Sequence, residues 1–239
     1  MGAVLQPRPC LGLVPLVTSR AVQLLPSVRT GREAPIYSQH RRLPMILTEL
    51  TTILTAQLPI SLLREHLRLG TGFAEDSAQD ALLEAYLRAA ISAVEGRTGV
   101  VLLEKSFSWG LTAWRHYDRQ VLPVRPVSAI SEVKTVDVVG LEIVLDSGLY
   151  RLCKDDQAPA IAAVGLALPS IPLNGSAEIS FAAGYGADWA NVPPDLARAA
   201  IMLAADFYEN RATQDATSLP AGVLALLERF RPIRVFGGV

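Results

Sequence analysis

The residues that could carry acid–base or metal chemistry are few and scattered. His40, His66 and His116 stand far apart, and a solvent-facing position is the better interpretation of His66. The chain contains no H-E-x-x-H, G-x-S-x-G or G-x-x-x-x-G-K-[ST] motif, which argues against a zinc protease, a serine hydrolase and a P-loop nucleotide site. Asp155 and Asp156 could ligate a cation, but EF-hand spacing is absent, so two solvated loop carboxylates are the better interpretation.

Two further patterns could bind a phosphate or an aromatic ligand. The run Gly184-Tyr185-Gly186 has too few glycines for a phosphate loop and favours a turn after a strand. Trp109 and Trp114 could stack on a base or a sugar, although packing within a sheet explains them better. Cys10 and Cys153 lack zinc-site spacing and suggest no disulfide framework, which favours a reducing compartment. We therefore expect no catalytic residue, no metal and no cofactor.

Composition indicates a globular protein. Of 239 residues, 50% are apolar and 19% are charged, which is enough for one good core or two small ones. The formal net charge of −1 argues against bulk electrostatic binding to nucleic acid. No apolar run reaches the roughly 18–20 residues that cross a bilayer.

The first 44 residues differ from the rest. They carry six arginines against one glutamate, a net charge of +5, so residues 45–239 carry −6. They also hold many prolines and show no lasting periodicity. Three interpretations stay open: a transit peptide, a basic arm for nucleic acid or a partner subunit, or translation from a start codon set too early. We favour the last, with Met45 as the natural start, because domain-like patterning begins just after it.

The elements that must position any functional surface are helices at both ends of the domain. The helix expected at residues 193–211 begins at Pro193 and Pro194. Asp195 lies in its first turn, where the helix dipole favours an anion. Its apolar residues recur on one face and leave few positions for water. The expected helices span residues 60–69, 77–97, 193–211 and 220–230.

The middle of the chain, residues 105–182, has the pattern of strands. Residues 105–114 alternate polar and apolar side chains, and β-branched residues and turn-like glycines follow. The order is helices, then strands, then helices, which predicts an α+β fold: a helical bundle with an antiparallel β-rich middle.

The C-terminal end predicts an extended arm. Pro232 stops the preceding helix, and Ile233, Val235 and Phe236 favour extended backbone. A frayed tail with solubilising arginines is the alternative. Such an arm could add a strand to a partner or enter a groove.

The motifs together carry a resemblance, and their order and spacing are more specific than any one of them. In this order, the chain resembles the head–tail connector (adaptor) family of long-tailed phages and phage-derived gene transfer agents over residues 47–236. The motifs are Leu62–Arg68, Asp80–Ala90, Glu95–Gly99, Leu122–Val127, Ile179–Gly186, Val192–Leu196, Phe207–Arg211, Leu219–Val223 and Leu226–Arg231.

The resemblance implies a structural role without catalysis. Adaptor subunits form a homo-oligomeric ring, commonly a dodecamer, beneath the portal, where they extend the DNA channel and meet a stopper or tail-completion protein. The family implies assembly in the bacterial cytoplasm and a place in the neck of the mature particle, without sequence-specific DNA binding or a membrane. A negative body suits a channel through which DNA slides, because neutralising phosphates is what creates binding.

The resemblance also implies where the contacts lie. We expect a basic Pro-rich extension at 1–44, which lies outside the resemblance and need not be native, an adaptor domain at 45–231 with a β-rich insertion at 105–186, and the C-terminal extended arm at 232–239. The portal-interface candidates are Arg229, Arg231, Pro232, Ile233, Arg234, Val235 and Phe236, and the ring-interface candidates are Tyr208, Arg211, Trp109 and Trp114.

A second interpretation from another class stays open. The chain could be a small soluble α+β enzyme or ligand-binding domain with an N-terminal targeting peptide. A pocket lined by converging polar groups with perturbed pKa values would favour it. A ring-forming flank and a protruding C-terminal arm would favour the adaptor.

Overall fold

The chain divides into two units, residues 1–41 and 42–239, and every described element belongs to the second. The computed structural model describes residues 45–69, 76–210 and 219–231. Over these ranges the helices are α1 (Ile60–His66), α2 (Asp76–Thr98), α3 (Pro194–Glu209) and α4 (Ala221–Leu227). The strands are β1 (Met45–Glu49), β2 (Lys105–Leu111), β3 (Arg119–Val121), β4 (Val127–Val136), β5 (Glu142–Val144), β6 (Tyr150–Cys153), β7 (Ala160–Ala163) and β8 (Ser176–Ala183).

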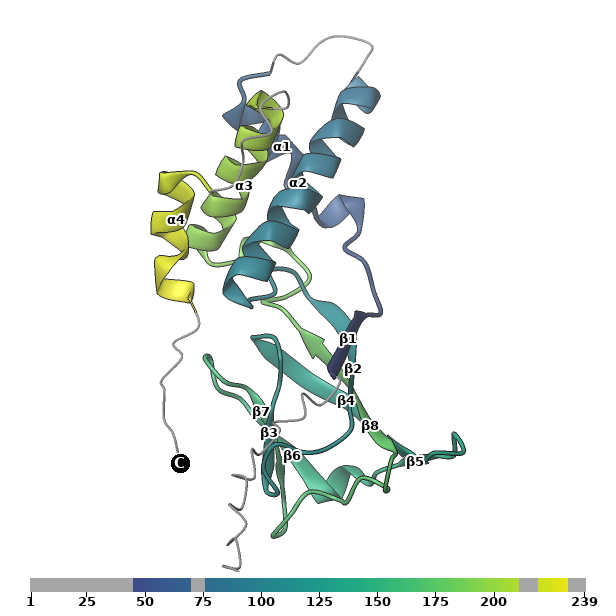
Figure 1. The fold of residues 1–239 in the computed structure, drawn as a ribbon. Coiled ribbons are helices and arrows are strands. Elements are labelled where there is room, and N and C mark those ends of the chain that lie inside the picture. Colours follow the sequence, from purple (N-terminus) through teal and green to yellow (C-terminus); the bar gives the residue numbers. More distant parts are fainter. Residues whose placement is uncertain (1–44, 70–75, 211–218, 232–239) are drawn as a thin grey trace, which may run out of the picture. The chain divides into compact units, whose positions relative to one another are not determined.

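The four helices group together, with α3 packed against α1, α2 and α4 (Figure 1). The buried face of α3 is largely alanine and leucine, and it packs in one hydrophobic cluster with the buried residues of α2. On α2, one row of apolar side chains is fully buried against α3: Leu83, Leu87, Ala90 and Val94. None of the described helices is both long and apolar enough to cross a membrane.

Local signals explain where these helices begin and end. Pro194 lies at the first turn of α3, where no backbone N–H partner is needed, and Asp195 follows in the same turn. At the C-terminal end of α2, the Thr98 hydroxyl donates to the Val94 carbonyl at 2.8 Å, and Gly99 then takes a φ of +68°. Near the start of α2, Asp80 forms an ion pair with Arg64 of α1.

The strands form two antiparallel sheets. The larger has the order β1-β2-β8-β4-β5, and the smaller has the order β3-β7-β6. Side chains on β2 and β8 alternate, so that one face of the larger sheet is buried. There Phe107 of β2 stacks on Phe181 of β8 with ring centroids 5.6 Å apart, in a second hydrophobic cluster apart from that of the helices.

The predicted α+β class with a β-rich middle is confirmed. Several boundaries differ. The first helix ends at His66 and not at 69, since Arg68 takes a φ of +53°. The last helix ends at Leu227 and tightens into a 3₁₀ turn at Glu228–Phe230.

Two strands were not predicted. β1 is exposed along its whole length and shows no buried alternation. β7 is mostly alanine, a weak strand former, and lies between β3 and β6, where pairing on both sides and burial stabilise it.

Candidate functional site

The two described arginines among the portal candidates lie on the surface where the described chain ends. Arg229 has a side chain that is 73% exposed and pairs with Asp195 at the start of α3, at 2.9 Å. Arg231 pairs with Glu228 at 3.1 Å and is also exposed. Both charges are available to a partner, because exposed ion pairs of this kind are weak. The other five candidates, Pro232 to Phe236, lie outside the described residues.

A buried arginine fixes the position from which this surface begins. Arg125, in the segment between β3 and β4, is 6% exposed. Its guanidinium donates to the carbonyl of Phe230 at 2.5 Å, to the carbonyl of Thr98 at 3.4 Å and to the side chain of Gln157. It therefore joins the last turn of the C-terminal helix to the end of α2 and to the β region.

A cavity of about 400 Å³ lies beside this arginine. Tyr185, Asp195, Arg229 and Phe230 help to line it. Burial raises the pKa of the Tyr185 phenol, and the nearby charge of Arg125 opposes that rise. The phenol is therefore neutral at pH 7. The charged side chains of Asp195 and Arg229 in this cavity pair with each other, and that of Arg125 is bound to the Phe230 carbonyl.

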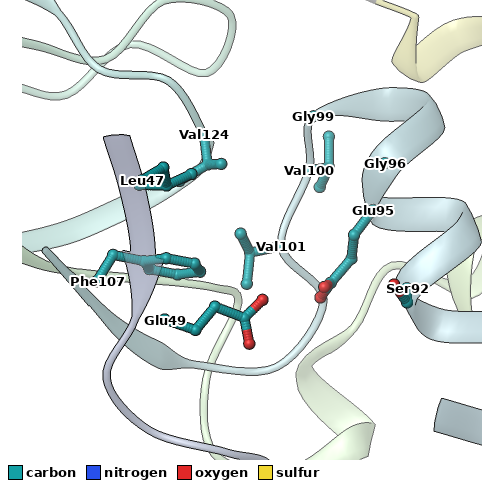
Figure 2. A pocket seen from close by; sticks show the side chains of 10 residues that line it. All are labelled: Leu47, Glu49, Ser92, Glu95, Gly96, Gly99, Val100, Val101, Phe107 and Val124. Carbon is teal, nitrogen blue, oxygen red and sulfur yellow. The ribbon is translucent and has the colours of Figure 1, made fainter. Parts of the chain in front are cut away.

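A second cavity, of about 270 Å³, lies beside β1 and is lined by a pair of acids that invites comparison with a catalytic site. Figure 2 shows Glu49 of β1 and Glu95 of α2 turned toward the same gap, with Val101 and Phe107 beside them. Lys105 of β2 binds both carboxylates, at 3.1 Å to Glu49 and 2.8 Å to Glu95. Glu95 also accepts the backbone N–H of Leu102 at 2.9 Å.

The electrostatics of this cluster follow from burial. Removal from water raises the pKa of Glu95 above its ordinary value of 4.5, and the Lys105 ammonium opposes that rise. Because the folded state holds the proton more tightly, this carboxyl favours folding most below pH 4.5 and favours it less as the pH rises through the raised pKa. The cluster joins β1, β2 and α2, and each of its charged groups already has a partner, so its geometry explains structure better than catalysis.

The remaining candidates for chemistry do not converge in the described ranges. His66 and His116 are exposed and lie in separate elements. The Asp155 side chain accepts hydrogen bonds from the backbone N–H groups of Gln157 and Ala158, at 2.7 and 3.0 Å, within its own loop. These bonds lower the pKa of Asp155. Among residues whose placement is described, no group of three His, Cys, Asp or Glu side chains could hold a metal ion.

The ring-interface candidates do not form one surface. Trp109 is 2% exposed inside the sheet core, so its side chain offers nothing to a neighbouring subunit and we do not carry it forward. Trp114 is half-buried and donates to the Pro169 carbonyl at 2.7 Å. Tyr208 lies on α3 in the hydrophobic cluster of the helices. Its ring is edge-on to that of Tyr86, with the ring centroids 6.1 Å apart. Arg211 lies outside the described residues.

Solved structures show what the chain resembles. A chain from the neck of an empty gene transfer agent (GTA) particle, computed with C6 symmetry, is 47% identical, with a TM-score of 0.75. A chain from the virion of a native GTA particle is 48% identical, with a TM-score of 0.72, and one from a native neck computed with C12 symmetry is 44% identical, with a TM-score of 0.70. Each match covers 81% of this chain and 98% of the other. No protein-family model matches the chain, and no curated protein does.

Proposed function

This chain belongs to the head–tail connector (adaptor) family of phages and gene transfer agents, and from that premise we propose that it is a structural, non-enzymatic protein of the neck of a phage-like particle. The observation that carries the proposal is the identity of 44–48% over 98% of each neck or virion chain. A likeness of that extent includes both the helices and the β region, since it also covers 81% of this chain.

The finer proposal is a ring, with twelve copies, between the portal and a stopper or tail-completion protein. The relatives from necks computed with C6 and C12 symmetry support rotational assembly. In a cyclic ring each copy offers two different surfaces to its two neighbours. We retain Tyr208, Trp114 and Arg211 as proposed contacts within this ring.

The portal contact is proposed for the C-terminal surface. Arg229 and Arg231 stand exposed where residues 232–239 begin, and Arg125 holds the last turn in place through the Phe230 carbonyl. A fixed base with exposed arginines suits an arm that docks on another protein, because arginine is enriched at such contacts. The ring would be built in the bacterial cytoplasm and then occupy the mature neck.

DNA would pass through this ring without sequence-specific binding. Residues 45–239 carry a net charge of −6, and a negative wall does not neutralise phosphates. This part of the proposal concerns the lumen, and a strongly positive lumen in the assembled ring would contradict it.

Native mass spectrometry of the purified full chain, alone and mixed with its portal protein, tests the proposal. We expect a closed ring of defined mass, formed alone or on the portal, and a joint complex with the portal. A strict monomer that ignores the portal would overturn it.

A further inference from the structure

The larger sheet ends in two exposed apolar edges, one at each side. The β1 edge is Met45, Ile46 and Leu47, and Ile46 is 67% exposed. The β5 edge is the hairpin from β4 to β5 with Val138, Val139, Leu141, Ile143 and Val144, and Val139 is 86% exposed. Within the described ranges each edge strand pairs on one side only, which leaves backbone N–H and C=O groups without a ladder partner.

The two edges lie at the same level of the sheet. The pairing register runs in one row from Met45 through Leu111, Ala177 and Thr135 to Ile143. The next row runs from Ile46 through Gly110, Glu178 and Lys134 to Val144. A rotation about an axis roughly along the strands would therefore bring the β5 edge of one copy to the β1 edge of the next.

The part of the sheet between the edges satisfies its own polar groups. In the second row Glu178 accepts a hydrogen bond from Ser108, and Lys134 pairs with Glu178 at 3.2 Å and with Glu142 at 3.1 Å. The Ser108 hydroxyl, and then the Lys134 ammonium, hold the pKa of Glu178 below its ordinary value. Polar groups thus pair along the middle of the row, while the residues at its two ends, Ile46 and Val144, are exposed and aliphatic.

The β1 edge also offers a receiving hollow. The cavity beside it is lined by the apolar side chains of Leu47, Val101, Phe107 and Val124, and the carboxylates of Glu49 and Glu95 also face it (Figure 2). Lys105 binds both carboxylates. A cavity of about 270 Å³ with this lining has room for an aliphatic side chain. The tip of the β5 hairpin carries such side chains.

We propose that the β5 edge of each copy docks on the β1 edge and its hollow in the adjacent copy, and that this head-to-tail contact closes the ring. The inference rests on the proposed function, since the rotational symmetry of the related necks is what selects a second copy as the occupant. Two different apolar patches at opposite ends of one sheet suit a heterologous, closing interface.

The lysine variants Ile46→Lys and Ile143→Lys test this contact. Each places a charge in the apolar contact, where an unpaired charge is costly, but leaves it in water in the free subunit. We expect each to lose the ring species in native mass spectrometry while keeping the wild-type circular dichroism spectrum and melting temperature. Leu166→Lys is the matched control, because Leu166 is 92% exposed and lies on neither edge. It should form rings as the wild type does.

Disulfide cross-linking of a cysteine pair is a second test of this contact, and it does not require the ring to be disrupted. In a chain with Cys10→Ser and Cys153→Ser, Ile46→Cys and Val144→Cys, which end the same row of the register, together should yield a ladder of disulfide-linked oligomers after oxidation. Either cysteine alone should yield none, because a head-to-tail contact never brings two copies of the same edge together.

The outcomes separate this contact from the ring itself. Rings of wild-type yield in both lysine variants, or no ladder from a cysteine pair that still forms rings, would overturn the contact and leave the neck function standing. A wild-type chain that forms no ring and ignores the portal would overturn the proposed function, and this contact with it.

Discussion

A chain that ends at Arg231 is expected to lose attachment to the portal while its domain stays folded. The hydrophobic clusters of the described residues reach Phe230, and the truncated chain keeps all of these residues. The free energy of unfolding should therefore stay within about 0.5 kcal/mol of the wild type, as for most surface changes. Co-purification with the portal protein and urea unfolding measure the two effects.

A length-matched control separates the arm's side chains from its mere presence. In this variant residues 232–239 are replaced by glycine and serine, and portal attachment should be lost as in the truncation. A second variant, Arg229→Gln with Arg231→Gln, keeps the arm and should weaken attachment without abolishing it. Wild-type attachment by the truncated chain would refute the role of the arm.

The second large effect is expected from Lys105→Met, in the cluster that joins β1, β2 and α2. Lys105 is 5% exposed and stands between Glu49 and Glu95, so its loss leaves a buried carboxylate without its cation. Breaking a buried pair from one side costs about 3–5 kcal/mol. Urea unfolding at pH 7 should show a loss of that size.

The effect of Lys105→Met should also depend on pH. Without the ammonium the pKa of Glu95, already raised by burial, rises further, because Lys105 lowers it more than any other group does. Below that pKa the carboxyl is protonated and needs no cation. The loss of unfolding free energy should thus be largest at neutral pH and should shrink as the pH falls.

Lys134→Met is the matched control for this variant. Lys134 also joins two carboxylates, but both of them are more exposed than Glu95. Its substitution should cost much less stability, since pairs near water contribute little. Equal losses in the two variants would contradict the importance of burial in the Lys105 cluster.

The helices and central strands could be predicted because their own residues carry the signal. The row of Leu83, Leu87, Ala90 and Val94 is buried as its helical spacing predicts. On β8 the alternation of Ala177, Ile179 and Phe181 gives the period of a half-buried strand, and these three are buried as well.

The contacts that hold the parts together could not be predicted, because their partners are far apart in sequence. Lys105 meets Glu49 from 56 residues away, through the pairing of β1 with β2. Arg125 meets the Phe230 carbonyl from 105 residues away. Nothing local in either segment identifies the partner.

The β1 edge was missed for a different reason. A strand that is exposed along its whole length has no buried alternation, which is the signal that predicts a strand from sequence. Trp109 shows the opposite error, because an aromatic residue considered for a surface lies inside the core. Surface positions are therefore harder to predict from this sequence than core positions.

The most direct test of the neck role is a cryo-electron microscopy reconstruction of particles assembled with this chain. We expect a ring of this chain directly against the portal, with the residues after Arg231 in contact with it and β5 of each copy against β1 of the next. Particles whose neck contains no density for this chain would contradict it.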